Sequence, residues 1–183
     1  MPKILSIILF LVSIIYLPFP ISLFSLIIFL YLNKYLNKYI VIFGYILLFI
    51  FQIYSTRIQS NLEFSGYQNF LHQQNLDSYP PSLFRIGNIV ENKIESPLFY
   101  RFRQNIFNCF DFVNYFKNYF ITILFIPFIF GLIKLIKSSN KTFLNLLIIS
   151  IVLLAFIGTD GKYGPLLLLP FIVNIISFYS CET

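Results

Sequence analysis

The sequence predicts an all-α membrane protein: a polytopic transmembrane helical bundle of about six spans with an extracytoplasmic amphipathic helical cap. Hydrophobic residues make up 58% of the chain and charged residues only 11%, whereas soluble proteins carry about 25% charged residues. The mean hydropathy is +0.80. A water-soluble chain of 183 residues has too little interior for so much apolar surface. We therefore expect residues 1–183 to form a single membrane domain.

Residues 4–32 form an uncharged N-terminal run that is interrupted by LPFP at 17–20. As one helix, this run would reach about 43 Å at 1.5 Å per residue, well beyond a hydrocarbon core of about 30 Å. The two prolines remove amide donors and disfavour a helical residue before each of them. The run is therefore either a hairpin of two short helices or one strongly kinked span, and we favour the hairpin.

Four further spans are predicted at 39–55, 119–136, 142–158 and 163–180. The uncharged runs that define them contain 16 to 19 residues, close to the lower limit of about 17 residues for a membrane-crossing helix. Lys134 lies inside the second of these spans, where its long side chain is able to reach the interface. Tyrosines recur at the ends of the spans, as they do in the aromatic belts of membrane proteins.

The lysines predict the orientation of the spans. Five lysines and no acid occur in the two segments 33–38 and 134–141, which the positive-inside rule assigns to the cytoplasm. We therefore expect a multi-pass protein of the cell inner (plasma) membrane, with both termini cytoplasmic and residues 56–118 extracytoplasmic. Lysines beside apolar runs differ from the basic, water-exposed face of a nucleic-acid reader. The expected partners are the lipid bilayer and other membrane proteins, and not nucleic acid.

Residues 56–118 hold most of the charges, and we expect helices there near 80–94 and 97–118. Prolines open the first helix, and a Ser-Pro pair opens the second as N-cap and first helical residue. The predicted apolar face of the second helix consists of Phe99, Phe102, Ile106, Phe110 and Val113. Its predicted polar face consists of Arg101, Gln104, Asn105, Asn108 and Asp111. Such a helix either lies on the outer leaflet or packs on the outer ends of membrane helices.

The same charged segment supplies the candidates for chemistry. Four carboxylates are candidate catalytic groups: Asp77, Glu91, Glu95 and Asp111. Three guanidinium groups are candidate phosphate ligands: Arg85, Arg101 and Arg103. Carboxylates one helical turn apart suit a divalent cation, and a guanidinium group binds phosphate in a bidentate manner. The alternative, a solvated surface with weak ion pairs, is the more common outcome of such spacing.

Gln52, Asn145 and Asn174 are polar side chains that we predict inside the membrane, where amides commonly join neighbouring helices. No acid, lysine or arginine lies deep in a predicted span, which counts against an ion-coupled transporter. Cys109 and Cys181 show neither a CxxC pattern nor paired-ligand spacing. We expect no cofactor and no metal site.

Three functions remain open. We favour a non-enzymatic scaffold or subunit in cell-envelope assembly, because no catalytic motif accompanies the well-marked topology. An envelope enzyme that acts on a lipid-phosphate or a lipid-linked sugar would need the candidate carboxylates and guanidinium groups to converge. A transporter or channel component would need a polar path near Asn174 and Gln52.

Overall fold

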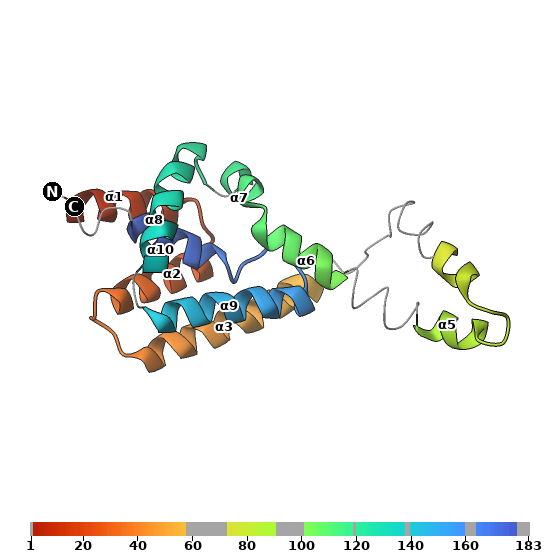
Figure 1. Ribbon diagram of the computed structural model, residues 1–183. Coiled ribbons are helices and arrows are strands. Elements are labelled where there is room, and N and C mark those ends of the chain that lie inside the picture. Colours follow the sequence, from red (N-terminus) through yellow and green to blue (C-terminus); the bar gives the residue numbers. More distant parts are fainter. Residues whose placement is uncertain are drawn as a thin grey trace.

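The computed structural model describes residues 2–57, 73–90, 101–118, 120–137, 140–159 and 164–178. Every regular element in these residues is a helix (Figure 1). The all-α class predicted from the sequence is therefore confirmed for the described part of the chain. Most of the helices form one body, and Figure 1 shows residues 73–90 apart from it.

The helices of the body are α1 (Pro2–Ile15), α2 (Phe19–Leu32), α3 (Lys38–Arg57), α6 (Arg101–Phe110), α7 (Phe112–Asn118), the 3-10 helix η2 (Thr122–Leu124), α8 (Phe125–Lys137), α9 (Lys141–Ile157) and α10 (Leu169–Phe178). Outside the body, residues 73–78 are helical and α5 spans Phe84–Val90. A turn precedes α5, in which the amide of Leu83 donates to the carbonyl of Pro80 at 2.8 Å. The helix expected near 80–94 thus begins after this turn.

The LPFP stretch separates α1 from α2. Pro18 has an extended backbone conformation with φ −56° and ψ 148°, which interrupts a helix. Pro20 stands in the first turn of α2, where an amide hydrogen would have no partner within the helix. The ring of Phe10 stacks on that of Phe29 with centroids 4.3 Å apart. The N-terminal run therefore consists of two short helices that fold back on each other.

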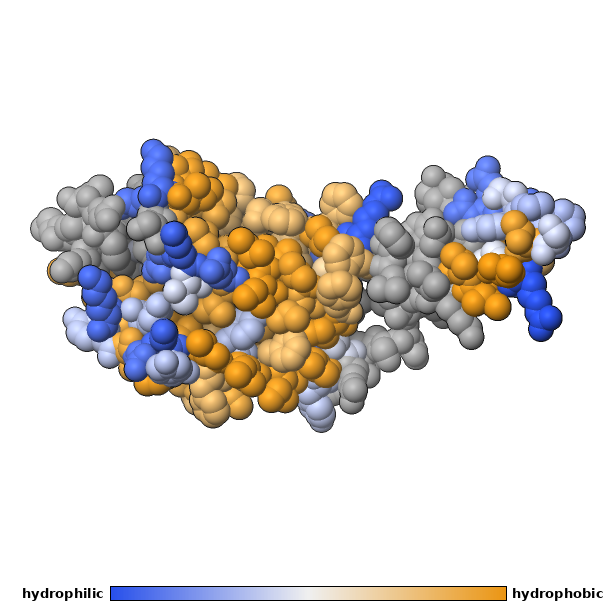
Figure 2. Space-filling model, turned by 60° about the horizontal axis from the view of Figure 1, so that its bottom comes forward, coloured by the Kyte–Doolittle hydropathy of each residue, from blue (hydrophilic) through white to orange (hydrophobic). Residues whose placement is uncertain are grey.

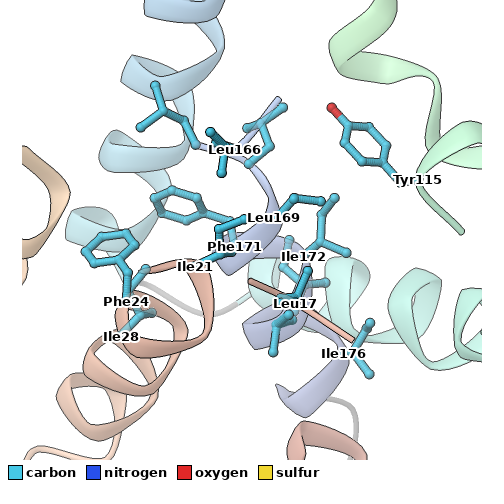
Figure 3. Close-up of a cluster of buried hydrophobic side chains, with 14 of the residues drawn as sticks. Leu17, Ile21, Phe24, Ile28, Tyr115, Leu166, Leu169, Phe171, Ile172 and Ile176 are labelled. Carbon is cyan, nitrogen blue, oxygen red and sulfur yellow. The ribbon is translucent and has the colours of Figure 1, made fainter. Parts of the chain in front are cut away.

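The central element of the body is α10. All residues of 166–177 are buried, and α10 packs against α1, α2 and α8. Phe171 meets Phe24 of α2 and Phe143 of α9 edge to face, with centroids 6.4 and 5.2 Å apart. Figure 3 shows Phe171 close to Ile21 and Phe24 of α2. A helix that is mainly apolar all round belongs in an interior, and α10 occupies that position, with its polar Asn174 and Ser177 also buried.

Two glycines allow helices to cross closely. At Gly131 of α8, a β-carbon would overlap the backbone carbonyl of Ile175 in α10, so a larger residue requires a helix backbone to move. At Gly44 of α3, a β-carbon would approach the ring of Phe24 to 2.9 Å. A side chain is able to rotate away, and the second crossing is therefore the more tolerant one.

One narrow stripe of α3 is buried. Its residues are Val41, Gly44, Tyr45, Leu48, Gln52 and Ser55, which follow the period of a helix. The exposed side chains of α3 include Ile40, Ile42, Phe43, Ile46, Leu47 and Ile50. A peripheral helix of a water-soluble protein has a polar outer face, whereas this outer face is apolar. Figure 2 shows apolar surface over much of the body.

Two of the long helices, α3 and α9, run in the same direction (Figure 1). The hydroxyl of Ser150 donates to that of Tyr45 at 3.3 Å, and the amide of Gln52 donates to the carbonyl of Gly158 at 3.4 Å. These partners are 105 and 106 positions apart in the chain. Because this separation in sequence is nearly the same for both contacts, α3 and α9 run parallel, and residues about 105 positions apart lie side by side. Their first residues, a lysine in each helix, therefore lie at the same end of the body.

The length of the helices limits how many of them cross a membrane alone. Only α3, among the described helices, is long and apolar enough to do so, over Lys38–Thr56. Thr122–Lys137 and Lys141–Ile157 pass the same test together but are bent by 118°, as in a broken span or a re-entrant loop. The 14, 14 and 10 residues of α1, α2 and α10 correspond to about 21, 21 and 15 Å. The described residues thus contain one strong candidate span, where the sequence predicts about six.

Candidate functional site

The C-terminal end of α9 is covered by α6 (Figure 1). The ring of Phe102 packs against that of Phe156 with centroids 5.0 Å apart. The side-chain amide of Asn105 donates to the carbonyl of Ala155 at 3.1 Å. The last four carbonyls of a helix lack a partner within it, and Asn105 satisfies one of those of α9. Of the two arrangements that the sequence allows, α6 adopts packing on the end of another helix.

Thr159 connects α6 to the chain that leaves α9. Its amide and its hydroxyl donate to Oδ1 of Asn105 at 3.4 and 3.2 Å. Its hydroxyl oxygen accepts from the amide of Asn108 at 2.9 Å. Asn105 is only 7% exposed, and its side-chain oxygen and nitrogen are both bonded. Fully bonded buried amides fix the position of the elements that they join, here α6 and α9.

The inward face of α6 differs from the predicted one. Its buried and half-buried residues are Phe102, Asn105, Ile106 and Cys109. Phe110 and Val113, which were assigned to the apolar face, are 54% and 72% exposed. Asn105, which was assigned to the polar face, points inward. The physical reason is that an unpaired carbonyl at the end of α9 accepts a hydrogen bond from the side-chain amide of Asn105. The spacing of apolar residues in α6 cannot predict this bond, because the carbonyl belongs to a distant helix.

Asp111 separates α6 from α7. Its side-chain oxygen accepts from the amide of Asn114 at 3.1 Å, which is the hydrogen bond of an N-cap residue. The single helix expected over 97–118 is therefore divided in two within its described part. One candidate catalytic carboxylate thus has a structural partner at the start of α7.

A polar cavity of about 200 Å³ lies beside this junction, and we call it the polar pocket. Its lining residues are Asn108, Asp111, Asn114, Tyr115, Thr159, Gly164 and Pro165. These described residues provide one carboxylate, amides and hydroxyls but no cationic side chain, so the pocket suits a small neutral or cationic polar molecule. Two of its groups also hold the fold, because Asn108 binds Thr159 and Asp111 caps α7.

Gln52 holds the connection between α9 and α10. Its amide nitrogen donates to the carbonyls of Gly158 and Gly164 at 3.4 and 3.2 Å. Both glycines have a positive φ, 116° and 57°, which residues with a β-carbon rarely adopt. The Oε1 atom of Gln52 has no hydrogen-bond partner among the described residues. The predicted intramembrane Gln52 thus lies near the end of α3 and binds backbone carbonyls there.

The other two predicted intramembrane amides have different surroundings. Asn174 is buried in α10, and its amide donates to the carbonyls of Ser25 in α2 and of Pro170 at 3.1 and 2.8 Å. This contact is an interhelical bond of the kind that the sequence led us to expect. Asn145 is exposed on α9. The structure therefore does not gather the three amides at one place.

The candidate phosphate ligands are also dispersed. Arg85 belongs to α5, which Figure 1 shows apart from α6. Arg103 is exposed on α6, and its guanidinium carbon lies 5.8 Å from the centroid of the Phe107 ring. Arg101 begins α6, and its side chain lies outside the description. The structure brings none of these described groups together.

The candidate carboxylates are dispersed in the same way. Asp77 lies in the helical residues 73–78, and Asp111 lies between α6 and α7. Glu91 and Glu95 fall outside the described residues. Within the part of the chain that the structure describes, no three histidine, cysteine or acidic side chains gather as a metal site.

Cys109 is a buried thiol on the inward face of α6. It is 2% exposed and forms no disulfide. Burial raises the pKa of this thiol to about 12. Because the thiolate is the nucleophilic form of cysteine, this residue is an inert packing group in the folded protein.

The polar cluster of Asn105, Asn108 and Thr159 is the part of the site that sequence reasoning missed. A Gly-Thr pair follows the apolar run of α9, and two asparagines stand one turn apart on α6. Together these features are a weak signal for side chains that complete a helix end.

Comparisons of the chain with models of protein families, with curated proteins and with solved structures find no match. The function has to be inferred from the residues and contacts described above.

Proposed function

We propose that the chain is a multi-pass integral membrane protein that serves as a non-enzymatic scaffold or subunit in cell-envelope assembly. The apolar outer surface of the body carries this proposal. Exposed large hydrophobic side chains include Ile8 and Leu11 of α1, Leu26 of α2, Phe43 and Ile50 of α3, Ile126 and Ile133 of α8, and Ile148 and Val152 of α9. A soluble monomer rarely exposes a continuous apolar patch above a few hundred Å². Lipid solvates such a surface.

Short helices are compatible with several membrane crossings, because 3-10 or turn segments next to them lengthen the part of the chain that crosses the bilayer. η2 directly precedes α8, and together they form a segment of about 24 Å. Residues 166–168 precede α10 and are buried in protein, which is where irregular backbone is tolerated at membrane depth. A bilayer also thins locally around a short crossing. We therefore retain about six spans, two of them within 4–32.

The two ends of the body differ in charge. Lys34, Lys38, Lys137 and Lys141 lie where α3 and α9 begin, and we call this region the lysine end. Figure 2 shows hydrophilic side chains gathered toward that end of the body. The polar pocket lies near the opposite end of α9. With the lysine end in the cytoplasm, both termini are cytoplasmic, and the polar pocket faces outside together with residues 56–118.

The bonded state of the polar groups supports a structural role. Asn105 and Asn108 bind the end of α9 and Thr159, and Asp111 caps α7. The side chains of Asn105, Asn108 and Asp111 thus form hydrogen bonds that hold the helices in place. The apolar outer faces are then the surface through which the protein contacts other membrane proteins.

Reporter fusions test the topology. Alkaline phosphatase needs disulfides, which form outside the cytoplasm. Joined after residue 90 it should be active, and joined after residue 137 it should be inactive. Equal activity of the two fusions would contradict the orientation.

Chemical cross-linking in native membranes tests the role. We expect defined larger complexes that contain the chain. A chain that purifies alone and converts a lipid-linked substrate would overturn the non-enzymatic assignment.

A further inference from the structure

We propose that the α2–α3 hairpin binds an anionic phospholipid, with an acyl chain in a groove between the two helices and the phosphate beside the lysine end. This inference rests on the proposed membrane location and adds a ligand class to it. Two independent features carry it. One is an apolar groove of suitable size, and the other is a set of lysines without acids near one end of that groove.

The groove is an apolar cavity of about 380 Å³ along the outside of the hairpin, and we call it the hairpin groove. Its walls include Phe19, Leu23 and Ile27 of α2 and Phe43, Leu47 and Phe51 of α3. Gly44 and Phe24 also line it, and the ring of Phe24 packs closely against Gly44 at its floor. A volume in this range is typical of small-molecule sites, which span about 300 to 1,000 Å³.

The shape of the hairpin groove favours an acyl chain over a partner helix. Ile40 and Phe51 both line it and are eleven positions apart on α3, which is about 16 Å along the axis. Helices approach closely in membranes where small residues line the contact. Here nearly all the lining side chains are large, and Gly44 stands alone among them on α3. A flexible hydrocarbon chain fits between large side chains where a rigid helix does not.

The lysine end supplies the site for the headgroup. Lys34 and Lys38 are exposed in the turn between α2 and α3 and at the start of α3. The groove reaches Ile40, which lies about 3 Å along the axis from the level of Lys38, on a different face of α3. Because α3 and α9 are parallel and in register, Lys141 lies at the same level of the body. No acid occurs in segment 33–38. Basic clusters of this kind attract anionic lipid headgroups.

A single tryptophan in the groove reports on the lipid. The chain contains no tryptophan, so Phe43→Trp introduces the only one, on the groove wall. The variant is reconstituted into phosphatidylcholine vesicles that contain rising fractions of brominated phosphatidylglycerol or, in parallel, of brominated phosphatidylcholine. We expect quenching to show a preference of about five-fold for phosphatidylglycerol, the ratio expected from one lysine contact.

Further variants test whether the preference for phosphatidylglycerol depends on Lys34 and Lys38. Lys34→Asn together with Lys38→Gln, added to Phe43→Trp, should bring the ratio close to one. Asparagine is chosen because Lys34 has φ 64°, which asparagine tolerates. Arg103→Gln removes a charge from exposed α6 and should leave the preference unchanged. Ile148→Trp, on the exposed face of α9 outside the groove, should show a ratio near one.

The outcomes are separable. Equal quenching of Phe43→Trp by the two lipids overturns the inference, and so does a preference that survives in the double lysine variant. Quenching by neither lipid in protein-containing vesicles means that protein fills the groove, which also overturns it. A protein that does not float with vesicles contradicts the membrane location itself.

Discussion

The helices α3 and α10 resemble each other in composition and differ in what surrounds them. Both are mainly apolar, but protein covers α10 on every side, whereas α3 buries a single stripe. The buried helix has 10 residues and the peripheral helix has 20. Phe43 and Ile50 on the outer face of α3 are more than half exposed.

Under the proposed membrane location, the difference means that the fold has two apolar environments, one of protein around α10 and one of lipid around the outer face of α3. Exposing apolar area to water is unfavourable by about 25 cal/mol per Å², and this disfavours an outer face like that of α3 in solution. In lipid the same face has no such penalty. Under the same proposal α10, which protein covers, does not have to match the thickness of a bilayer and is free to be short.

A charge on the outer face of α3 should have the largest effect. We expect Ile46→Lys to lower membrane insertion by about 3 kcal/mol, because a lysine at the centre of a span is unfavourable by that amount. The fraction of carbonate-resistant, membrane-inserted protein measures the effect. Tyr35→Lys, in the exposed turn after α2, is the matched control and should be neutral. Equal insertion of Ile46→Lys and wild type would place this face in water.

Filling the contact of α8 with α10 should have the next largest effect. Gly131→Leu forces a side chain against the backbone carbonyl of Ile175, and overpacking of this kind lowers stability by about 3 kcal/mol. Thermal unfolding in detergent, followed by maleimide labelling of Cys109 in a Cys181→Ser background, measures it. Gly44→Ala is the control, and it should lose less because the ring of Phe24 is able to move. A larger loss in Gly44→Ala would contradict the central position of α10.

Removing the side-chain amide of Asn105, beside the polar pocket, should lower the stability more than removing that of Asn174 in the interior. Asn105→Ala leaves the carbonyl of Ala155 and the hydroxyl of Thr159 with fewer partners, so we expect a loss of about 1 to 2 kcal/mol. Asn174→Leu removes one bond between α10 and α2, and such bonds average about 0.6 kcal/mol in membranes. The same unfolding assay compares them. A larger loss of stability in Asn174→Leu than in Asn105→Ala would show that the amide of Asn105 does not hold α6 in place.

The ionisation of the Cys109 thiol should have the smallest effect on stability, because it does not occur near neutral pH. Burial raises its pKa from 9.0 to about 12, so the folded protein binds this proton more tightly than the unfolded chain. Its contribution to stability is complete below pH 9 and decreases as the pH rises toward 12. The pH dependence of thermal unfolding, compared between the wild type and Cys109→Ser, measures this contribution. The same pH dependence in the two proteins between pH 9 and 12 would contradict the burial of this thiol between α6 and the body.

Local signals predicted the helices better than the site. The two prolines of LPFP act on their own backbone, so the break between α1 and α2 follows from the sequence. The uncharged run after Lys38 similarly indicates α3. The lysine-bearing starts of α3 and α9 were also visible as local runs, and the structure places them at one end.

Contacts between distant segments were not predictable in the same way. The amide of Asn105 reaches a carbonyl fifty positions away, and a helix pattern cannot register that partner. The residue type and position of Asp111 predict a candidate for chemistry, whereas in the structure its carboxylate caps α7. The length of α10 depends on the helices that enclose it, so an uncharged run of 19 residues did not predict a helix of 10.

Tryptophan fluorescence on the outer face of α3 tests the central claim most directly, because the chain has no tryptophan of its own. In reconstituted vesicles, Ile46→Trp should be quenched by lipids brominated on the acyl chain and protected from iodide in the buffer. Tyr35→Trp, in the exposed turn, should show the opposite pattern. Iodide quenching of Ile46→Trp as strong as that of Tyr35→Trp, with no quenching by brominated lipid, would contradict a body surrounded by lipid.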